Sequence, residues 1–141
     1  MDLEVGQVLW LRVKYQPTII ATVPHPMLVA IENIEDNSIE VIAIDKARDK
    51  IYQLFNEANF FIDSENPKEQ VIRIDSYAQL NNKLKIEYFP ELVKYRKTKA
   101  KLSKCKLKEL LSAYKEYQSN NFIPDYRQIY MSKQDILEWN K

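Results

Sequence analysis

The chain has 141 residues, 45% of them hydrophobic and 29% charged, and its formal net charge is +1. This composition is typical of an ordinary globular domain and argues against disorder, and no apolar run reaches the roughly 18 residues of a membrane span. A single Cys and a single His argue against an internal disulfide and a structural zinc site. We therefore expect one cytoplasmic domain with no membrane contact, no signal peptide at its acidic N-terminus, no metal and no other cofactor.

Alternating apolar and polar residues predict short strands in the first half of the chain. In residues 6–14, Val8 and Trp10 fall on one face, and Leu9 and Leu11 fall on the other. Further strands are expected at 18–23, 27–34 and 39–45, the last two joined by a polar turn at 35–38 into a hairpin.

The period changes after this hairpin. Apolar side chains recur at Ile51, Leu54, Phe55 and Ala58, which predicts an inserted amphipathic helix over about 46–58. Strands are then expected at 59–62, 71–81 and 83–88, with a turn at 64–68.

The last third of the chain reads as helical. Pro90 suits the first turn of a short helix through about 97, and Ser103 suits the N-cap of a longer one. The longer helix has an apolar stripe of Leu107, Leu110, Leu111, Tyr114 and Tyr117. A strand at 127–131 and a final helix capped at Ser132 complete the chain.

These elements predict an α+β fold in a single domain over residues 1–141. A small, strongly bent β-sheet or barrel would occupy about 5–88, with the inserted helix, and helices would occupy about 89–141.

The predicted strand at 71–81 carries two charges in its middle. Residues two apart share a face of a strand, so Arg73, Asp75 and Tyr77 should lie opposite the apolar Ile72 and Ile74. One interpretation is an exposed ion pair, which contributes little to stability. The other is a site on the sheet surface, where a guanidinium holds a phosphate and a carboxylate accepts a proton.

The only histidine, His25, lies between Pro24 and Pro26. Prolines restrict the backbone on both sides, so the imidazole is held on a rigid loop, and histidine suits acid–base work near neutral pH. A solvated loop histidine is the alternative. If the fold brings His25 to Arg73 and Asp75, the three could cleave a phosphodiester without a metal.

Charge is distributed unevenly along the chain. Residues 1–82 carry 7 Lys or Arg and 13 Asp or Glu, whereas residues 83–115 carry 11 and 3. The basic segment offers Lys94, Arg96 and Lys97 to RNA phosphates, and Tyr77 could stack on a base. The same segment could instead be a solvated helix face, receive an acidic protein segment, or help the chain dimerise.

Four stretches, in this order, resemble the PemK/MazF-like toxin endoribonucleases, and the Kid-like members most closely. They are Gly6 with QVLWL, HPMLVAI at 25–31, VIAID at 41–45 and VIRIDSYAQLN at 71–81, and the resemblance covers about residues 5–118. It implies an SH3-like, PemK-type β-barrel that forms a homodimer, cleaves single-stranded RNA without a metal, and is neutralised by a cognate antitoxin protein.

The resemblance also assigns roles to residues. Asp75 would take the proton of the 2′-hydroxyl, and Arg73 would stabilise the charge of the phosphorane. Either Arg73 or His25, which is chemically the better acid, would deliver a proton to the leaving oxygen. The product would end in a 2′,3′-cyclic phosphate. Asp45 stands where many members have Thr or Ser, which makes it a candidate accessory residue.

Two rival functions stay open. His25 and Asp45 depart from the common family pattern, which favours a non-catalytic small-barrel module that binds protein or nucleic acid. Gyrase poisons share the barrel and act through a tryptophan near the chain end, as Trp139 is, but Asn140 and Lys141 do not resemble their tail.

Overall fold

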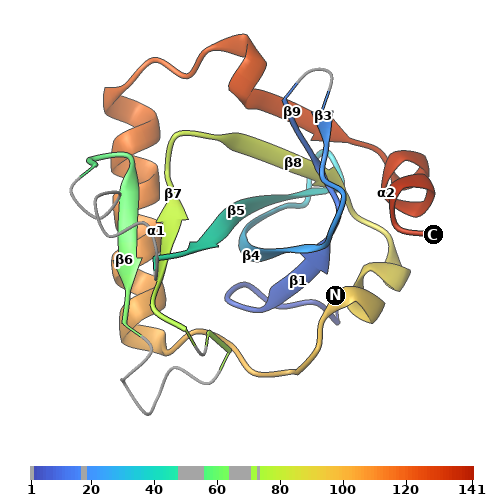
Figure 1. The fold of residues 1–141 in the computed structure, drawn as a ribbon, viewed down its shortest axis with the longest axis horizontal. Coiled ribbons are helices and arrows are strands. Elements are labelled where there is room, and N and C mark those ends of the chain that lie inside the picture. The colour runs from blue at the N-terminus through green and yellow to red at the C-terminus, as the bar shows by residue number, and fades with distance from the viewer. Residues whose placement is uncertain (1, 17–18, 48–55, 64–70, 73) are drawn as a thin grey trace.

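The computed structural model describes residues 2–16, 19–47, 56–63, 71–72 and 74–141. It shows a mixed α+β protein built around a mainly antiparallel sheet (Figure 1). One long helix stands beside two of the strands, and a short helix lies at the far side, near the C-terminus.

The described residues form nine strands and four helical segments. The strands are β1 (Val8–Leu11), β2 (Lys14–Gln16), β3 (Ile19–Ile20), β4 (His25–Asn33), β5 (Ser38–Lys46), β6 (Asn59–Ile62), β7 (Ser76–Gln79), β8 (Lys83–Glu87) and β9 (Gln128–Met131). The α-helices are α1 (Lys104–Asn120) and α2 (Lys133–Trp139), and the 3₁₀ helices are η2 (Pro90–Tyr95) and η3 (Asp125–Arg127).

The main sheet has the strand order β1-β4-β5-β7-β6, and β2 and β3 form a separate two-stranded sheet. The second long strand, β5, pairs along one edge with both β7 and β8. Near its C-terminal end Ile44 pairs with Ala78 of β7, and nearer its N-terminal end Val41 pairs with Leu84 of β8. The last strand, β9, runs parallel to β8. No pairing among the described residues joins β1 to β6 or β9, so these pairings leave the sheet open.

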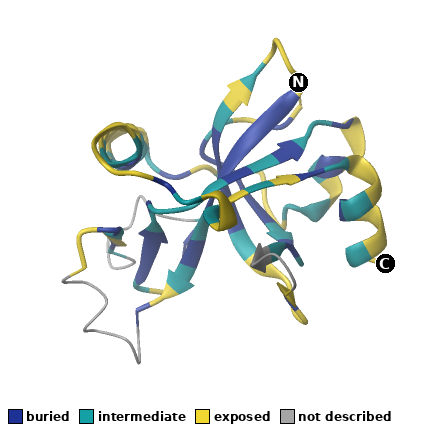
Figure 2. Ribbon diagram, turned by 90° about the horizontal axis from the view of Figure 1, so that it is seen from above, coloured by how far each residue is buried: buried dark blue, intermediate teal, exposed yellow. Residues whose placement is uncertain are grey.

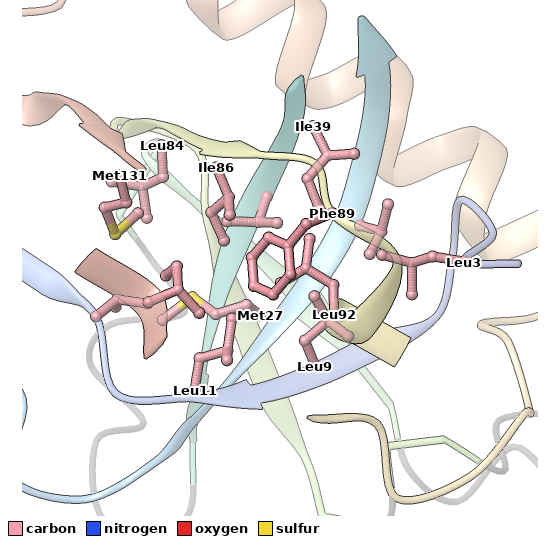
Figure 3. Packing of buried hydrophobic residues seen from close by; sticks show 14 residues of the cluster. Leu3, Leu9, Leu11, Met27, Ile39, Leu84, Ile86, Phe89, Leu92 and Met131 are labelled. Carbon is pink, nitrogen blue, oxygen red and sulfur yellow. The ribbon is translucent and has the colours of Figure 1, made fainter. Parts of the chain in front are cut away.

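Two hydrophobic clusters lie on the two faces of the long strands. In β5, Ile39 and Val41 belong to the first cluster, whereas Ile42 and Ile44 belong to the second. Residues of η2, β9 and α2 complete the first cluster, whose side chains converge around Phe89 (Figure 3). Helix α1 covers the second cluster. In Figure 2 the buried residues follow the strands, and the helix beside the C-terminus exposes its outer side.

Several predictions based on local patterns are confirmed. The predicted alternation in β1 is present, with Val8 and Trp10 in the second cluster and Leu9 and Leu11 in the first. The hydroxyl of Ser103 accepts from the amide of Lys106 and caps α1, and the predicted apolar stripe packs against the second cluster. A capping box at Ser132 begins α2.

The predicted strand at 71–81 is wrong in its first half, because β7 is much shorter. Its partner β5 ends at Lys46, opposite Ser76. One further bond joins the two segments, from the amide of Ala47 to the carbonyl of Asp75 at 2.9 Å. Before that point, the described residues of this stretch lie outside any strand.

The face assignment of the same stretch fails for this reason. Ile72 is buried, as expected, but Ile74 is 40% exposed. Tyr77 was expected on the face opposite the apolar residues, toward solvent. It is only 4% exposed, because the sheet is buried on both faces at β7. The alternation therefore does not separate a core face from a solvent face.

Other boundaries also differ from the prediction. The helix expected at 46–58 falls largely on residues 48–55, outside the described residues; at its start, Lys46 is instead the last residue of β5, and residues 56–58 form a bend and turn. The helix at Pro90 is 3₁₀ rather than α. The strand expected at 6–14 divides into β1 and β2.

Candidate functional site

A cavity of about 640 Å³ opens where several segments that are distant in the sequence meet. Its walls come from β1, the start of β4, the end of β5, the stretch 71–76 and the loop at 97–98. Most of the wall is apolar, and the charged side chains in it are Asp45, Lys46 and Lys97. A wall of this composition can hold a partly apolar ligand that carries an anionic group.

His25 is the first residue of β4 rather than part of a loop, which corrects the prediction. It pairs with Leu11 of β1, whereas the ladder with β5 begins only at Met27, opposite Ala43. The side chain is exposed and lines the cavity. The pairing with β1 fixes the backbone of His25 at the cavity wall. No described β5 residue pairs with it in the ladder, and its imidazole is exposed to solvent.

Asp45 lies in the same wall and is held by the neighbouring strand. Its Oδ2 accepts a hydrogen bond of 3.0 Å from the hydroxyl of Tyr77, the residue directly opposite on β7. Its Oδ1 accepts one of 2.8 Å from the amide of Lys46. Tyr77 thus orients a cavity carboxylate, and its buried ring offers little area to a base.

The other two predicted catalytic residues are placed less directly. Asp75 is half-buried and lies between two wall residues, Ile74 and Ser76, but its own side chain does not line the cavity. Arg73 lies outside the described residues. The structure therefore brings His25 to the stretch that carries Asp75, while their roles stay predictions.

Of the three predicted RNA-binding cations, only Lys97 lines the cavity. Its Nζ lies 3.8 Å from the centre of the Trp10 ring. The guanidinium of Arg96 instead donates to Oε1 of Gln7 at 3.0 Å and to the carbonyl of Asp2 at 3.2 Å. Lys94 is exposed on η2, outside the cavity wall.

Sequence reasoning missed two wall residues. The sequence pattern places Trp10 only on a strand face, and it places Lys46 at the start of a helix. The sequence indicates that Trp10 packs against another side chain, since a bulky aromatic residue on a short strand needs such a contact. No local pattern indicated that the partner would be the distant Lys97.

The described wall of the cavity carries more positive than negative side chains. Within the part of the chain that the structure describes, neither Lys46 nor Lys97 forms an ion pair, although Lys85, Lys101 and Lys106 do. Asp45 is the only acidic wall residue among those described. The same described residues contain no group of three His, Cys, Asp or Glu side chains that could hold a metal ion.

Comparisons with known proteins do not assign the chain to a family. No family model matches it, and no curated protein does. Among the described residues, none of the helices has the length and apolar character required to cross a bilayer.

Proposed function

We propose that this protein binds single-stranded RNA at the His25 cavity and cleaves it as an endoribonuclease. The observation that carries the proposal is the convergence of an exposed histidine, Lys46, Lys97 and Trp10 around one cavity, with neither lysine in an ion pair to another described residue. Cations suit backbone phosphates, an aromatic face suits an unpaired base, and a histidine supplies a proton donor or acceptor.

The proposed reaction needs no group beyond RNA and the protein. The 2′-oxygen attacks the adjacent phosphorus, a new O2′–P bond forms, and the P–O5′ bond breaks. A carboxylate accepts the 2′ proton, for which the family resemblance favours Asp75, and His25 donates a proton to the departing 5′ oxygen. Lys97 and Lys46, with Arg73 as the resemblance implies, stabilise the charge on the phosphoryl oxygens.

The resemblance supports further proposals about the whole protein. These are a PemK-type, SH3-like arrangement of the sheet, a homodimer, an acidic antitoxin partner and a cytoplasmic location. The exposed lysines at 94–108 support the antitoxin proposal, since they would attract an acidic protein segment. Light scattering of the purified chain tests the dimer.

The decisive experiment incubates the protein with mixed single-stranded RNA in EDTA. We expect cleavage to 2′,3′-cyclic ends, a loss of about 100-fold or more in His25→Ala, and a comparable loss in Asp75→Ala. Glu32→Ala is the matched control, because Glu32 is exposed on the same strand as His25 and lies outside the cavity. Equal cleavage by wild type and His25→Ala would refute the assignment of His25.

A second candidate function is an RNA-binding module without catalysis. Two observations favour it: Asp45 is already bonded to Tyr77, and the side chain of Asp75 does not line the cavity. Binding of RNA with no cleavage by wild type would select this function. A gyrase poison is less well supported, because Trp139 is partly buried against the first cluster, and a supercoiling assay tests it.

A further inference from the structure

We propose that Trp10 is a stacking platform for one unpaired base, that Lys97 covers this platform in the free protein, and that RNA displaces the ammonium, which then binds the adjoining phosphate. This inference rests on the proposed RNA binding and identifies where one nucleotide sits. It gives Trp10, which lies in the QVLWL stretch of the family resemblance, a binding role that the resemblance did not assign.

The ring of Trp10 is partly covered by protein and lines the cavity. Trp10 is half-buried and packs against the second cluster, so the cluster covers part of the ring. The ammonium of Lys97 lies 3.8 Å from the ring centre, on the cavity side. A base and the ammonium would need the same position, so binding of one excludes the other.

The backbone around Lys97 is fixed, although its side chain is exposed. Gln7, which is 1% exposed, accepts from Arg96 at 3.0 Å and donates through Nε2 to the carbonyl of Lys99 at 3.0 Å. The second bond holds the backbone at Lys99, and the first anchors the side chain of Arg96, so the chain is tied to Gln7 on both sides of Lys97. The ammonium can therefore swing from the ring to a phosphate without movement of the loop.

Replacement of the Lys97 ammonium by a base on the Trp10 ring is favourable for two reasons. A cation over a solvent-reachable ring is held weakly, whereas a base stacked on an aromatic side chain contributes more to binding. Lys97 has no carboxylate partner among the described residues, so its released charge is free to meet a phosphate. The apolar residues of the cavity wall, including Val23 and Ile74, suit the flat face of a base.

The ligand is single-stranded rather than duplex. A paired base inside a helix cannot present its face to a single recessed ring, whereas a loop or an end can. Every base has a face that stacks, so this site alone would favour unpaired nucleotides without reading a sequence.

The test uses a 2′-O-methylated, mixed-sequence single-stranded oligonucleotide, which keeps bases and phosphates but has no attacking hydroxyl. In a Trp139→Phe background, Trp10 is the only tryptophan, so its fluorescence reports on the platform. We expect saturable quenching on titration. A duplex of the same length should quench little.

Variants separate the two parts of the proposal. Trp10→Leu should weaken binding by about 10-fold or more, measured by a labelled oligonucleotide, and Trp10→Phe should weaken it less. Lys97→Met should weaken binding and reduce the slope of log affinity against log salt by about 0.7. Lys99→Met is the matched control, because Lys99 is exposed in the same loop and does not line the cavity.

The outcomes distinguish this inference from the proposed nuclease. Binding with quenching but no cleavage of unmodified RNA supports the platform and contradicts the nuclease. Cleavage that is unchanged in Trp10→Phe and Trp10→Leu supports the nuclease and overturns the platform. Oligonucleotide binding that leaves Trp10 emission unchanged, or no binding at all, also overturns the platform; thermal melting confirms that each variant is folded.

Discussion

Glu40 is a carboxylate on β5 that shares a face with Ile42 and Ile44 of the second cluster. It is 8% exposed. Its Oε1 accepts a hydrogen bond of 2.9 Å from the hydroxyl of Tyr114 on α1, and its Oε2 accepts one of 3.4 Å from the side-chain Nδ2 of Asn33. A buried charge is tolerated only when it has such partners. The Tyr114 bond therefore also fixes where α1 sits on the sheet.

Removal of the Tyr114 hydroxyl should be costly. In Tyr114→Phe the carboxylate of Glu40 loses its shorter bond while it stays buried, so we expect a loss of about 1–3 kcal/mol in the free energy of unfolding. Urea denaturation measures it. Tyr117→Phe, one turn later on α1, is the control, because its hydroxyl makes no hydrogen bond to the described residues. Equal losses in both variants would contradict this account.

Tyr114 also predicts a pH effect. Burial, followed by the charge and hydrogen bond of Glu40, raises the pKa of Tyr114 above its ordinary value of 10.0. The folded state then keeps a proton that the unfolded state loses, so this stability is present below pH 10 and is lost as the pH rises above it. We expect the urea midpoint of wild type to fall more steeply above pH 10 than that of Tyr114→Phe. Parallel curves would show that Tyr114 does not cause the difference.

At the level of elements, Gly6 joins three parts of the fold. Its amide donates to the carbonyl of Val29 at 2.8 Å, and its carbonyl accepts from the amide of Leu102 at 3.0 Å. Its φ is +98°, and a Cβ there would lie 3.0 Å from Cδ2 of Leu107 on α1. Glycine thus lets β1 begin beside β4 and close to α1.

Gly6→Ala separates backbone strain from crowding. The end of the Leu107 side chain can move, so strain at positive φ should dominate and cost about 1–3 kcal/mol of unfolding free energy. The double variant with Leu107→Ala removes the crowding but keeps the strain. We expect Gly6→Ala to cost nearly as much in the Leu107→Ala background as in wild type, measured by denaturation. Full recovery in the double variant would mean that crowding was the cause.

The sequence predicted those elements whose signals are local. The caps at Ser103 and Ser132 act within one helical turn, and the β4–β5 hairpin closes over a short polar turn, so both were predictable. The length of β7 was not, because it depends on where β5 ends. The same limit applies to the site: His25 was found by its flanking prolines, whereas the contact of Trp10 with Lys97 depends on Gln7 holding a distant loop.

At the scale of the whole molecule, the C-terminal segment belongs to the core. The last strand, β9, pairs in parallel with β8, so the chain leaves the sheet, forms α1, and returns to the edge of β8. Met131 and Ile136 are both 0% exposed and belong to the first cluster, together with Leu9 and Leu84. The two ends of the sequence therefore contribute to one core, which indicates that α2 unfolds together with the sheet.

Two adjacent residues of α2 test this integration. Ile136 is 0% exposed and its neighbour Leu137 is 43% exposed, so the same truncation samples the core side and the outer side of one helix turn. We expect Ile136→Ala to cost about 2–5 kcal/mol of unfolding free energy, because it removes buried methyl groups and leaves a cavity, and Leu137→Ala to cost much less. Denaturation followed by both far-UV circular dichroism and Trp10 fluorescence, in a Trp139→Phe background, should show one coincident transition. If α2 only lay on the surface, Ile136→Ala would leave the denaturation midpoint reported by Trp10 unchanged. The first cluster would then be stable without the contacts that α2 makes.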